Sequence, residues 1–336
     1  MLSIALRNIL SGLLSSLFLA GLVCCSPVPD VSIPSPDVSG GSDDVSVSFR
    51  LGGLGTRSVS SSCDDQVSSW RVYLCEGGVV QYSGVSAGGD IVLTVTPGTY
   101  DVYALVNGGS LASEYSSESG LLSAVVPLVL SRDGNVVMFG SVNTVVADYT
   151  KTVRIPVDRV VGKVELESVR VDFSGRPDLA AKSFVLESVY LINVAGDCTL
   201  GGGTSPGVWY NRSAFAGSDA DGVLYDAVGV SLSGSSPYGT VHHFYACENP
   251  SVSDAHGGAW SPRFTRLVLQ TLLGGVRYYY SVDVKGILRN HCYRISEILI
   301  TDRGSLSPDE DVSDAVSVTL STSVAWDGDI TVEEES

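Results

Sequence analysis

The side chains that could support catalysis occur in this sequence in weak patterns. Residues 84–88 read GVSAG, which matches the GxSxG turn that exposes a nucleophilic serine between a strand and a helix. The residues after Ser86 predict another strand, so we interpret the segment as a hairpin loop. The histidines lack the HExxH spacing of a zinc site, and His242 and His243 should point to opposite faces of one strand. We therefore predict no enzyme, no catalytic residue, no metal and no cofactor.

Cysteine is the other residue type whose chemistry depends on its surroundings, and the sequence holds seven. Those in the body of the chain lack CxxC spacing, so zinc and redox motifs are not indicated. In an exported protein Cys63 could pair with Cys75 across neighbouring strands. Alternatively, all of them are small buried residues with at least one free thiol, and the sequence does not decide the disulfide state. These cysteines are Cys63, Cys75, Cys198, Cys247 and Cys292.

The remaining two cysteines follow an apolar run, residues 9–23, which has the length of the hydrophobic part of an export signal. The run is too short to span a bilayer as a helix. Leu22 lies three positions before Cys25, a spacing that resembles the signal of bacterial lipoproteins. The resemblance implies that Cys25, rather than Cys24, is acylated, for example with palmitate. Two or more acyl chains anchor a protein stably to a membrane. The alternative is an ordinary secretory signal with two incidental cysteines.

Composition excludes one class of partner and favours one class of fold. The chain carries 20 Lys and Arg against 37 Asp and Glu, a net charge of −17, which argues against binding nucleic acid. With 336 residues, 44% of them hydrophobic, the chain can bury a sizeable core. Abundant Gly and Tyr favour strands and turns over helices.

The body of the chain shows the two-residue alternation of half-buried strands. Residues 45–51 (VSVSFRL) alternate without a fault, and residues 316–326 alternate apolar with mostly hydroxyl side chains. No segment keeps a 3.6-residue apolar period, and the acidic stretch 309–314 is expected to be a solvated loop. Further strands are predicted at 70–76, 91–95, 99–106, 124–130, 135–139, 151–157, 159–173, 184–194, 240–247, 264–272, 276–284 and 291–300.

These patterns predict an all-β protein with two β-sandwich domains in tandem after a lipoprotein signal peptide. The predicted boundaries are a signal peptide at 1–24, a flexible lipid tether at 25–43, and sandwich domains at 44–155 and 156–336. Residues 197–240, rich in Gly, Ser, Asp and Pro, are expected to be a surface insertion in the second domain.

Four stretches carry a family resemblance when they are taken together. They are VRIPVDRVVGKVELESVRV (153–171), FVLESVYLINV (184–194), HHFYACENP (242–250) and YYYSVDVKGILRNHCYRISEILI (278–300). They resemble the fimbrillin superfamily of Bacteroidales bacteria, which includes type V pilins, their anchors and their tip proteins. The resemblance implies transthyretin-like β-sandwich domains and places Arg289 and Asn290 in the loop of a hairpin. Asn tolerates left-handed turn geometry, which suits that place.

The resemblance also implies a mechanism of assembly. In such pilins an arginine-directed protease removes the first strand, and the C-terminal strand of another subunit fills the vacated groove. The candidate cleavage sites are Arg57 and Arg50, and Arg57 is favoured because Arg50 lies within a strand pattern. Alternatively, both are ordinary surface arginines. The candidate displaced strand carries Val45, Val47, Phe49 and Leu51, and the candidate donor strand carries Val316, Val318, Leu320, Val324 and Trp326.

The predicted role is a structural or adhesive component of a cell-surface fimbrium, or its anchor, on the outer membrane. Its implied partners are other fimbrial subunits, the outer membrane through the lipid, and host or bacterial surface ligands. The alternative is a monomeric surface lipoprotein that binds carbohydrate or host protein through its second domain, where aromatic rings could stack on sugars. The sequence does not decide whether the protein belongs to the shaft, the tip or the anchor of a fimbrium, and it identifies neither the protease nor the ligand. The aromatic residues are Trp209, Tyr210, Tyr225, Tyr238 and Trp260.

Overall fold

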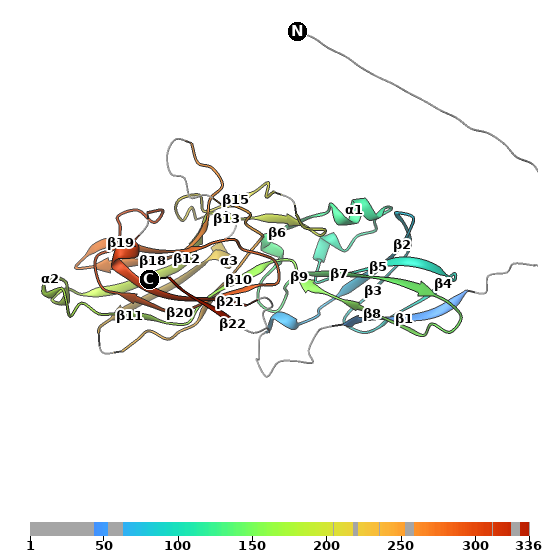
Figure 1. Cartoon of the computed structure of the whole chain (residues 1–336), viewed down its shortest axis with the longest axis horizontal. Coiled ribbons are helices and arrows are strands. Elements are labelled where there is room, and N and C mark those ends of the chain that lie inside the picture. The colour runs from blue at the N-terminus through green and yellow to red at the C-terminus, as the bar shows by residue number, and fades with distance from the viewer. Residues whose placement is uncertain are drawn as a thin grey trace, which may run out of the picture. The chain divides into compact units, whose positions relative to one another are not determined.

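The structure is a computed structural model of the whole chain, and it is built almost entirely of β-strands (Figure 1). It describes residues 44–52, 63–203, 205–217, 221–234, 236–252, 259–310, 312–323 and 330–335. The predicted signal peptide, tether and acylation site, together with Arg57, Val324 and Trp326, lie outside the described residues. Residues 42–336 form one compact unit. In the described part, no helix is long and apolar enough to cross a membrane.

Two sheets form the N-terminal part of the fold. The smaller has the strand order β4-β1-β8, and the larger has the order β3-β2-β5-β7-β9. Buried side chains from both sheets, such as Phe49 of β1 and Leu74 of β2, meet in one core cluster. The strands are β1 (Val45–Gly52), β2 (Trp70–Glu76), β3 (Val79–Ser86), β4 (Ile91–Val95), β5 (Gly98–Val106), β7 (Met138–Val146), β8 (Thr152–Pro156) and β9 (Asp158–Arg159).

Two further sheets form the C-terminal part. One has the order β17-β10-β20-β21-β22, with β11 also paired to β20, and the other has the order β16-β12-β18-β19. Apolar side chains between them form the largest core cluster. The strands are β10 (Gly162–Leu166), β11 (Val169–Val171), β12 (Phe184–Ile192), β16 (Tyr225–Leu232), β17 (His242–Ala246), β18 (Thr265–Leu273), β19 (Val276–Val284), β20 (Cys292–Ile300), β21 (Val316–Ser323) and β22 (Ile330–Glu335).

The largest core cluster extends into the N-terminal part. Strand β2 is buried on both faces, since Leu74 belongs to the N-terminal cluster whereas Tyr73 and Cys75 belong to the largest one. The short strands β6 (Val125–Pro127) and β14 (Asp197–Thr199) pair with each other, and β13 (Val194–Ala195) pairs with β15 (Trp209–Tyr210). The α-helices are α1 (Glu118–Leu122), α2 (Pro177–Ala180) and α3 (Asp221–Leu224); 3-10 turns lie at Cys63–Asp65, Gly109–Leu111, Leu128–Leu130 and Ser313–Ala315.

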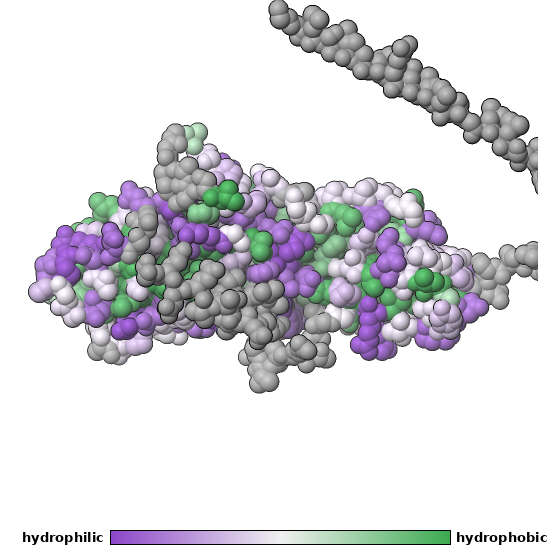
Figure 2. Space-filling model, in the orientation of Figure 1, coloured by the Kyte–Doolittle hydropathy of each residue, from purple (hydrophilic) through white to green (hydrophobic). Residues whose placement is uncertain are grey.

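Hydrophilic residues are abundant at one end of the visible face of the fold (Figure 2). Figure 2 shows hydrophilic and hydrophobic residues interspersed over the visible face, with hydrophilic residues gathered at the end that carries α2. There Arg176 and Arg303 form ion pairs with Asp178, at 3.2 Å and 2.8 Å. Exposed pairs of this kind contribute little to stability. The end of the fold at α2 is therefore polar (Figure 2), and its ion pairs add little to stability.

Two predicted hairpins are connections between sheets. Strands β3 and β4 flank the GVSAG segment, yet β3 pairs with β2 and β4 pairs with β1. Likewise β19 pairs with β18, whereas β20 pairs with β10 and β21. Strands β4, β19 and β20 were predicted and β3 was not, but two apolar faces of neighbouring strands can be buried by lying across a sandwich as well as by lying in one sheet. The sequence pattern does not distinguish these arrangements.

Several strands were not predicted, among them β3, β16 and β22. Part of the expected surface insertion, β16, pairs along its length with β12 as an edge strand. Its side chains are mostly exposed or half-buried, which explains its polar, Gly-containing sequence. Strand β22 pairs with β21 at the other end of the C-terminal sheet. In contrast, the alternation predicted for residues 45–51 is confirmed, because Val45, Val47 and Phe49 are all buried in β1.

Candidate functional site

The first candidate element is β1, which has a neighbour on each side. It pairs antiparallel with β4 and parallel with β8, so that Phe49 lies opposite both Ile91 and Val153. Val47 and Phe49 are completely buried in the N-terminal core, and Leu51 is half-buried. Burying Val45, Val47 and Phe49 stabilises the fold by roughly 5–9 kcal/mol gross. Removing β1 would therefore leave an apolar groove with two unpaired strand edges.

Arg50 lies near the end of β1, with its side chain on the outer face. Its Nε donates to Asp90 Oδ2 at 2.7 Å, and about half of each side chain is exposed. The residue also lies opposite Arg154 of β8 in the parallel ladder. The side chain is therefore accessible, whereas the peptide bond that a protease would cut lies in a paired strand. Arg57, the favoured cleavage site, lies outside the described residues.

The second candidate element is β21, the start of the predicted donor strand. Val316, Val318 and Leu320 are half-buried against the largest core, and the intervening side chains Ser317 and Thr319 are exposed, as the alternation predicts. The strand pairs with β20 on one side and with β22 on the other. It is thus an inner strand of its own sheet, and β22 is the last strand of that sheet. The sequence signal for β22, ITVEEE, has only two apolar residues.

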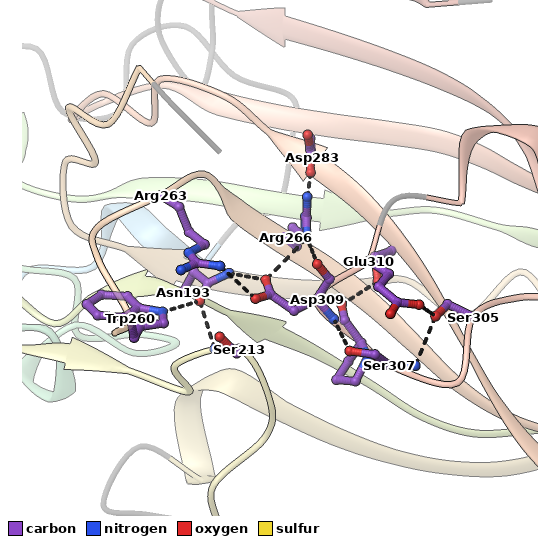
Figure 3. Close-up of polar contacts among 12 residues, drawn as sticks. Asn193, Ser213, Trp260, Arg263, Arg266, Asp283, Ser305, Ser307, Asp309 and Glu310 are labelled. Carbon is purple, nitrogen blue, oxygen red and sulfur yellow. Dashed lines mark hydrogen bonds and ion pairs between the residues drawn. The ribbon is translucent and has the colours of Figure 1, made fainter. Parts of the chain in front are cut away.

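A buried polar cluster holds the loop that leads into β21 (Figure 3). Asp309 accepts hydrogen bonds from Asn193 Nδ2 at 2.9 Å, Arg263 Nη1 at 2.9 Å and Arg266 Nη1 at 3.2 Å. Arg266, which is buried, also pairs with Asp283 at 2.7 Å. We call these five residues the Asp309 cluster. Because a buried carboxylate needs partners for its charge, the cluster fixes the loop before β21 to β18 and β19.

The prediction that the acidic stretch 309–314 is a solvated loop is wrong for Asp309. The residue is buried, whereas Asp314 is exposed as expected. The nearby Asn193 has a positive φ of 55° and accepts from Trp260 Nε1 at 3.1 Å and from the Ser213 backbone at 2.8 Å. These contacts join segments far apart in the chain, so no local spacing of residues could have revealed them.

A second polar cluster lies where the N-terminal and C-terminal sheets meet. Asp64 accepts hydrogen bonds from Lys163 Nζ at 3.1 Å and from the hydroxyl of Tyr245. Burial, together with the hydrogen bond to Asp64, raises the pKa of Tyr245. Burial alone would lower the pKa of Lys163, but the charges of Asp64 and Glu165 outweigh it and raise the pKa. Both groups therefore stay protonated as donors to Asp64.

The predicted loop residues Arg289 and Asn290 belong to this region. Asn290 has a φ of 57°, the left-handed geometry that was expected, and its side chain donates to Asp158 at 2.9 Å. Arg289 donates to the carbonyl oxygens of Thr199 and Leu200, each at 3.0 Å. The pair therefore joins separate segments, and does not close a hairpin.

Two adjacent histidines, His242 and His243, and the described aromatic residues of the expected insertion contact other parts of the protein. His242 is buried with Nδ1 2.7 Å from Asp226, and the half-exposed His243 lies 2.6 Å from Asp133, which confirms that they occupy opposite faces of β17. The Trp209 and Trp260 rings are in contact, with 5.4 Å between their centroids. A cavity of about 420 Å³ lies beside β17, lined by residues that include Asp133, His243 and Tyr245.

No family model matches the chain, and neither does any curated protein sequence. Comparison with solved structures shows that this chain shares its fold with cell adhesion proteins and fimbrilins of Bacteroidales bacteria, the fold that the sequence resemblance implied. A protein from Bacteroides eggerthii described as a cell adhesion protein superposes with a TM-score of 0.64 at 18% identity, over 83% of this chain and 95% of its own.

Two fimbrial proteins of Porphyromonas gingivalis share the fold. A fimbrilin superposes with a TM-score of 0.58 at 15% identity, over 82% of this chain and 96% of its own. The tip fimbrial protein Mfa3 superposes with a TM-score of 0.52 at 15% identity, over 83% and 99%. Identities this low establish a shared fold.

Proposed function

We propose that this protein is a structural or adhesive component of a cell-surface fimbrium, exported as an outer-membrane lipoprotein acylated on Cys25. The structural neighbours that are fimbrial or adhesion proteins support this role. The observation that carries the proposal is the position of β1, whose buried side chains fill the N-terminal core between β4 and β8. A first strand of this kind can be exchanged for a strand of a second subunit, which is recognition by β-strand addition.

The proposal is tested first by the intact mass and the N-terminal residue of the protein recovered from its own cells. A chain that begins at acylated Cys25 retains β1 and supports an anchor or an unprocessed precursor. A chain that begins at Ser58 or Leu51 supports a polymerising subunit. Cleavage after Arg57 removes all of β1, and cleavage after Arg50 removes part of it. A chain that keeps residues 1–24 and carries no acyl group contradicts export as a lipoprotein.

Strand exchange itself is tested with an arginine-specific protease. We expect cleavage of the purified protein to yield ladders of oligomers that resist dissociation, and we expect Arg57→Ala to abolish them. Arg50→Ala is the matched control, because its peptide bond lies in the paired strand β1. If the ladders form equally well in Arg57→Ala and fail in Arg50→Ala, the cleavage site is Arg50. Cleaved protein that stays monomeric contradicts strand exchange.

The donor strand is proposed to be the segment that begins with Val316, Val318 and Leu320. Because β21 is paired on both sides, it must leave β20 and β22 before it can enter a second subunit. Strand β22 is paired only to β21 among the described strands, so it competes as a donor. A chain truncated before Ile330 keeps polymerising if β21 is the donor. A chain truncated before Val316 serves as the control that loses both strands.

The alternative function is a monomeric surface lipoprotein that binds carbohydrate or host protein. The cavity beside β17 supports it, because the half-exposed His243 offers polar surface there. Under this alternative, protease treatment leaves monomers, and His243→Ala weakens binding on a glycan array while Tyr149→Ala, on an exposed residue outside that cavity's lining, does not.

A further inference from the structure

Two of the body cysteines lie against each other. Cys198 is the middle residue of β14, and Cys247 directly follows β17. Both side chains are buried. The backbone N–H of Cys247 donates to the carbonyl oxygen of Ala195, three residues before Cys198, at 3.3 Å. The main chain thus holds Cys247 beside the segment that carries Cys198.

The side chain of Arg289 forms hydrogen bonds with the residue that follows each cysteine. Arg289 Nη2 donates to the carbonyl oxygen of Thr199 at 3.0 Å and to Glu248 Oε2 at 3.3 Å. One guanidinium group therefore fixes the segments of Cys198 and Cys247 side by side, independently of the thiols. Its positive charge also favours the thiolate form of the nearby sulfur atoms.

We propose that Cys198 and Cys247 form a disulfide bond in the mature protein. The Cys198 thiolate attacks one sulfur of an external disulfide, either glutathione disulfide or an oxidised dithiol protein, and releases one thiolate from it. Cys247 then loses its proton and attacks the Cys198 sulfur, which expels the second thiolate. Two thiols of the chain are oxidised, and one external disulfide is reduced to two thiols.

The order of attack follows from the surroundings of each thiol. Interaction with the Cys247 thiol, with a further contribution from the Arg289 charge, lowers the pKa of Cys198 despite its burial. The pKa of Cys247 is raised by the same interaction and by complete burial. Because both sulfur atoms are covered in the fully folded chain, we expect the bond to form late in folding, after the two segments have met and before external disulfides are excluded. An oxidising compartment, which export would supply, is needed to keep it.

A disulfide between Cys198 and Cys247 would stabilise the contact between the N-terminal and C-terminal parts of the fold. Strand β14 pairs with β6, where Cys198 lies opposite Val126. Strand β17 pairs with β10 of the C-terminal sheet. A bond from Cys198 to Cys247 therefore ties the strand that contacts the N-terminal part to the C-terminal sheet.

The test is to refold the purified mature chain in an equimolar mixture of reduced and oxidised glutathione. Free thiols are then blocked with N-ethylmaleimide in denaturant, and the peptides are identified by mass spectrometry without reduction. We expect a peptide pair linked through Cys198 and Cys247, with Cys75 and Cys292 blocked. If Cys198 and Cys247 are both blocked instead, the proposal is overturned. The assay does not depend on the fimbrial role, so the two proposals can fail separately.

A second measurement compares thermal unfolding with and without a reductant. The bond closes a loop of about 50 residues, so we expect reduction to lower the Tm by on the order of 5–10 °C. The single variants Cys198→Ala and Cys247→Ala should lose this sensitivity to the reductant. Cys75→Ala and Cys292→Ala, which are buried as well, are the matched controls and should keep it. A Tm of the unmodified chain that reduction leaves unchanged contradicts a bond at this place.

Discussion

Individual buried charged residues hold distant segments of this fold together in ways that their sequence context does not indicate. Asp309 stands in a run of acidic and hydroxyl residues that is typical of a solvated loop, yet it lies among Asn193, Arg263 and Arg266. Its burial depends on partners from β18 and from the end of β12, which only the tertiary fold brings near. Arg289 and Asn290 illustrate the opposite case, because the turn preference of Asn was predictable although its partners were not.

Removal of the Asp309 carboxylate should destabilise the fold strongly. Asp309→Ala leaves the buried Arg263 and Arg266 without a shared acceptor, and breaking a buried ion pair typically costs about 3–5 kcal/mol. The free energy of unfolding is measured by urea denaturation. Asp314→Ala, on an exposed residue of the same loop, should change it by less than about 0.5 kcal/mol. Equal effects of the two variants would mean that the Asp309 cluster is not a stabilising contact.

Stability should fall in acid partly because of Glu165. The side chain accepts from Arg294 Nε at 3.0 Å and pairs with Lys163 at 3.2 Å. Burial alone would raise its pKa, but these two cations outweigh burial and lower the pKa from 4.5. A carboxylate with a lowered folded pKa stabilises the fold above its unfolded pKa, and this contribution is lost as the pH falls through the folded pKa.

Thermal unfolding measured from neutral to acid pH checks this sign. We expect the Tm of the unmodified chain to decline below about pH 4.5. Glu165→Gln should have a lower Tm at neutral pH and a shallower decline in acid. Glu114→Gln, on an exposed residue, is the control and should follow the unmodified chain. A Glu165→Gln curve parallel to that of the unmodified chain would contradict the prediction.

At the scale of elements, strands with one buried face were predictable and polar edge strands were not. Residues 276–284 were predicted as a strand with the bounds that β19 has, and β1 follows its predicted alternation. Strands β16 and β22 were missed because they lie at sheet edges, where few apolar residues are needed. Register and sheet membership were beyond prediction, since β3 and β4 follow each other in sequence but lie in different sheets.

One glycine shows how closely the strands approach. Gly140 of β7 has no room for a side chain, because a Cβ there would lie 1.9 Å from the carbonyl oxygen of Pro156. We expect Gly140→Ala to shift β7 away from the end of β8 and to lower the free energy of unfolding by at least 1–3 kcal/mol, about the cost of overpacking a core. Gly175→Ala, at a position with open space, should be neutral or slightly stabilising. The free energy of unfolding of both variants is measured by urea denaturation and compared with that of the unmodified chain.

At the scale of the whole molecule, the largest core cluster extends across both strand-rich parts of the chain, and the domain boundary near residue 155 stays a prediction. Residues 42–336 form one compact unit, and the largest core cluster includes Tyr73 and Leu105 beside the C-terminal apolar residues. Sequence composition could indicate two strand-rich parts, because each has its own alternating strands. It could not show that β2 would be buried on both faces.

A shared core predicts cooperative unfolding. We expect a variant that retains Trp70 as its sole tryptophan and a variant that retains only Trp260 to give fluorescence transitions with the same urea midpoint, after correction for the stability of each variant. Trp70 reports on the N-terminal core, and Trp260 contacts Trp209 in the C-terminal part. Two separated midpoints would instead indicate domains that unfold independently.

The parallel pairing of β1 with β8 has a mechanical consequence. A tensile load applied along β1 from the chain end before Val45 would be shared by hydrogen bonds to β4 on one side and to β8 on the other. Those bonds would be sheared together and could not open one at a time like a zipper. The rate of unfolding under force sets how long such a fold persists. A chain anchored through its N-terminus would therefore bear a pulling force through β1, the same strand whose removal would expose its core.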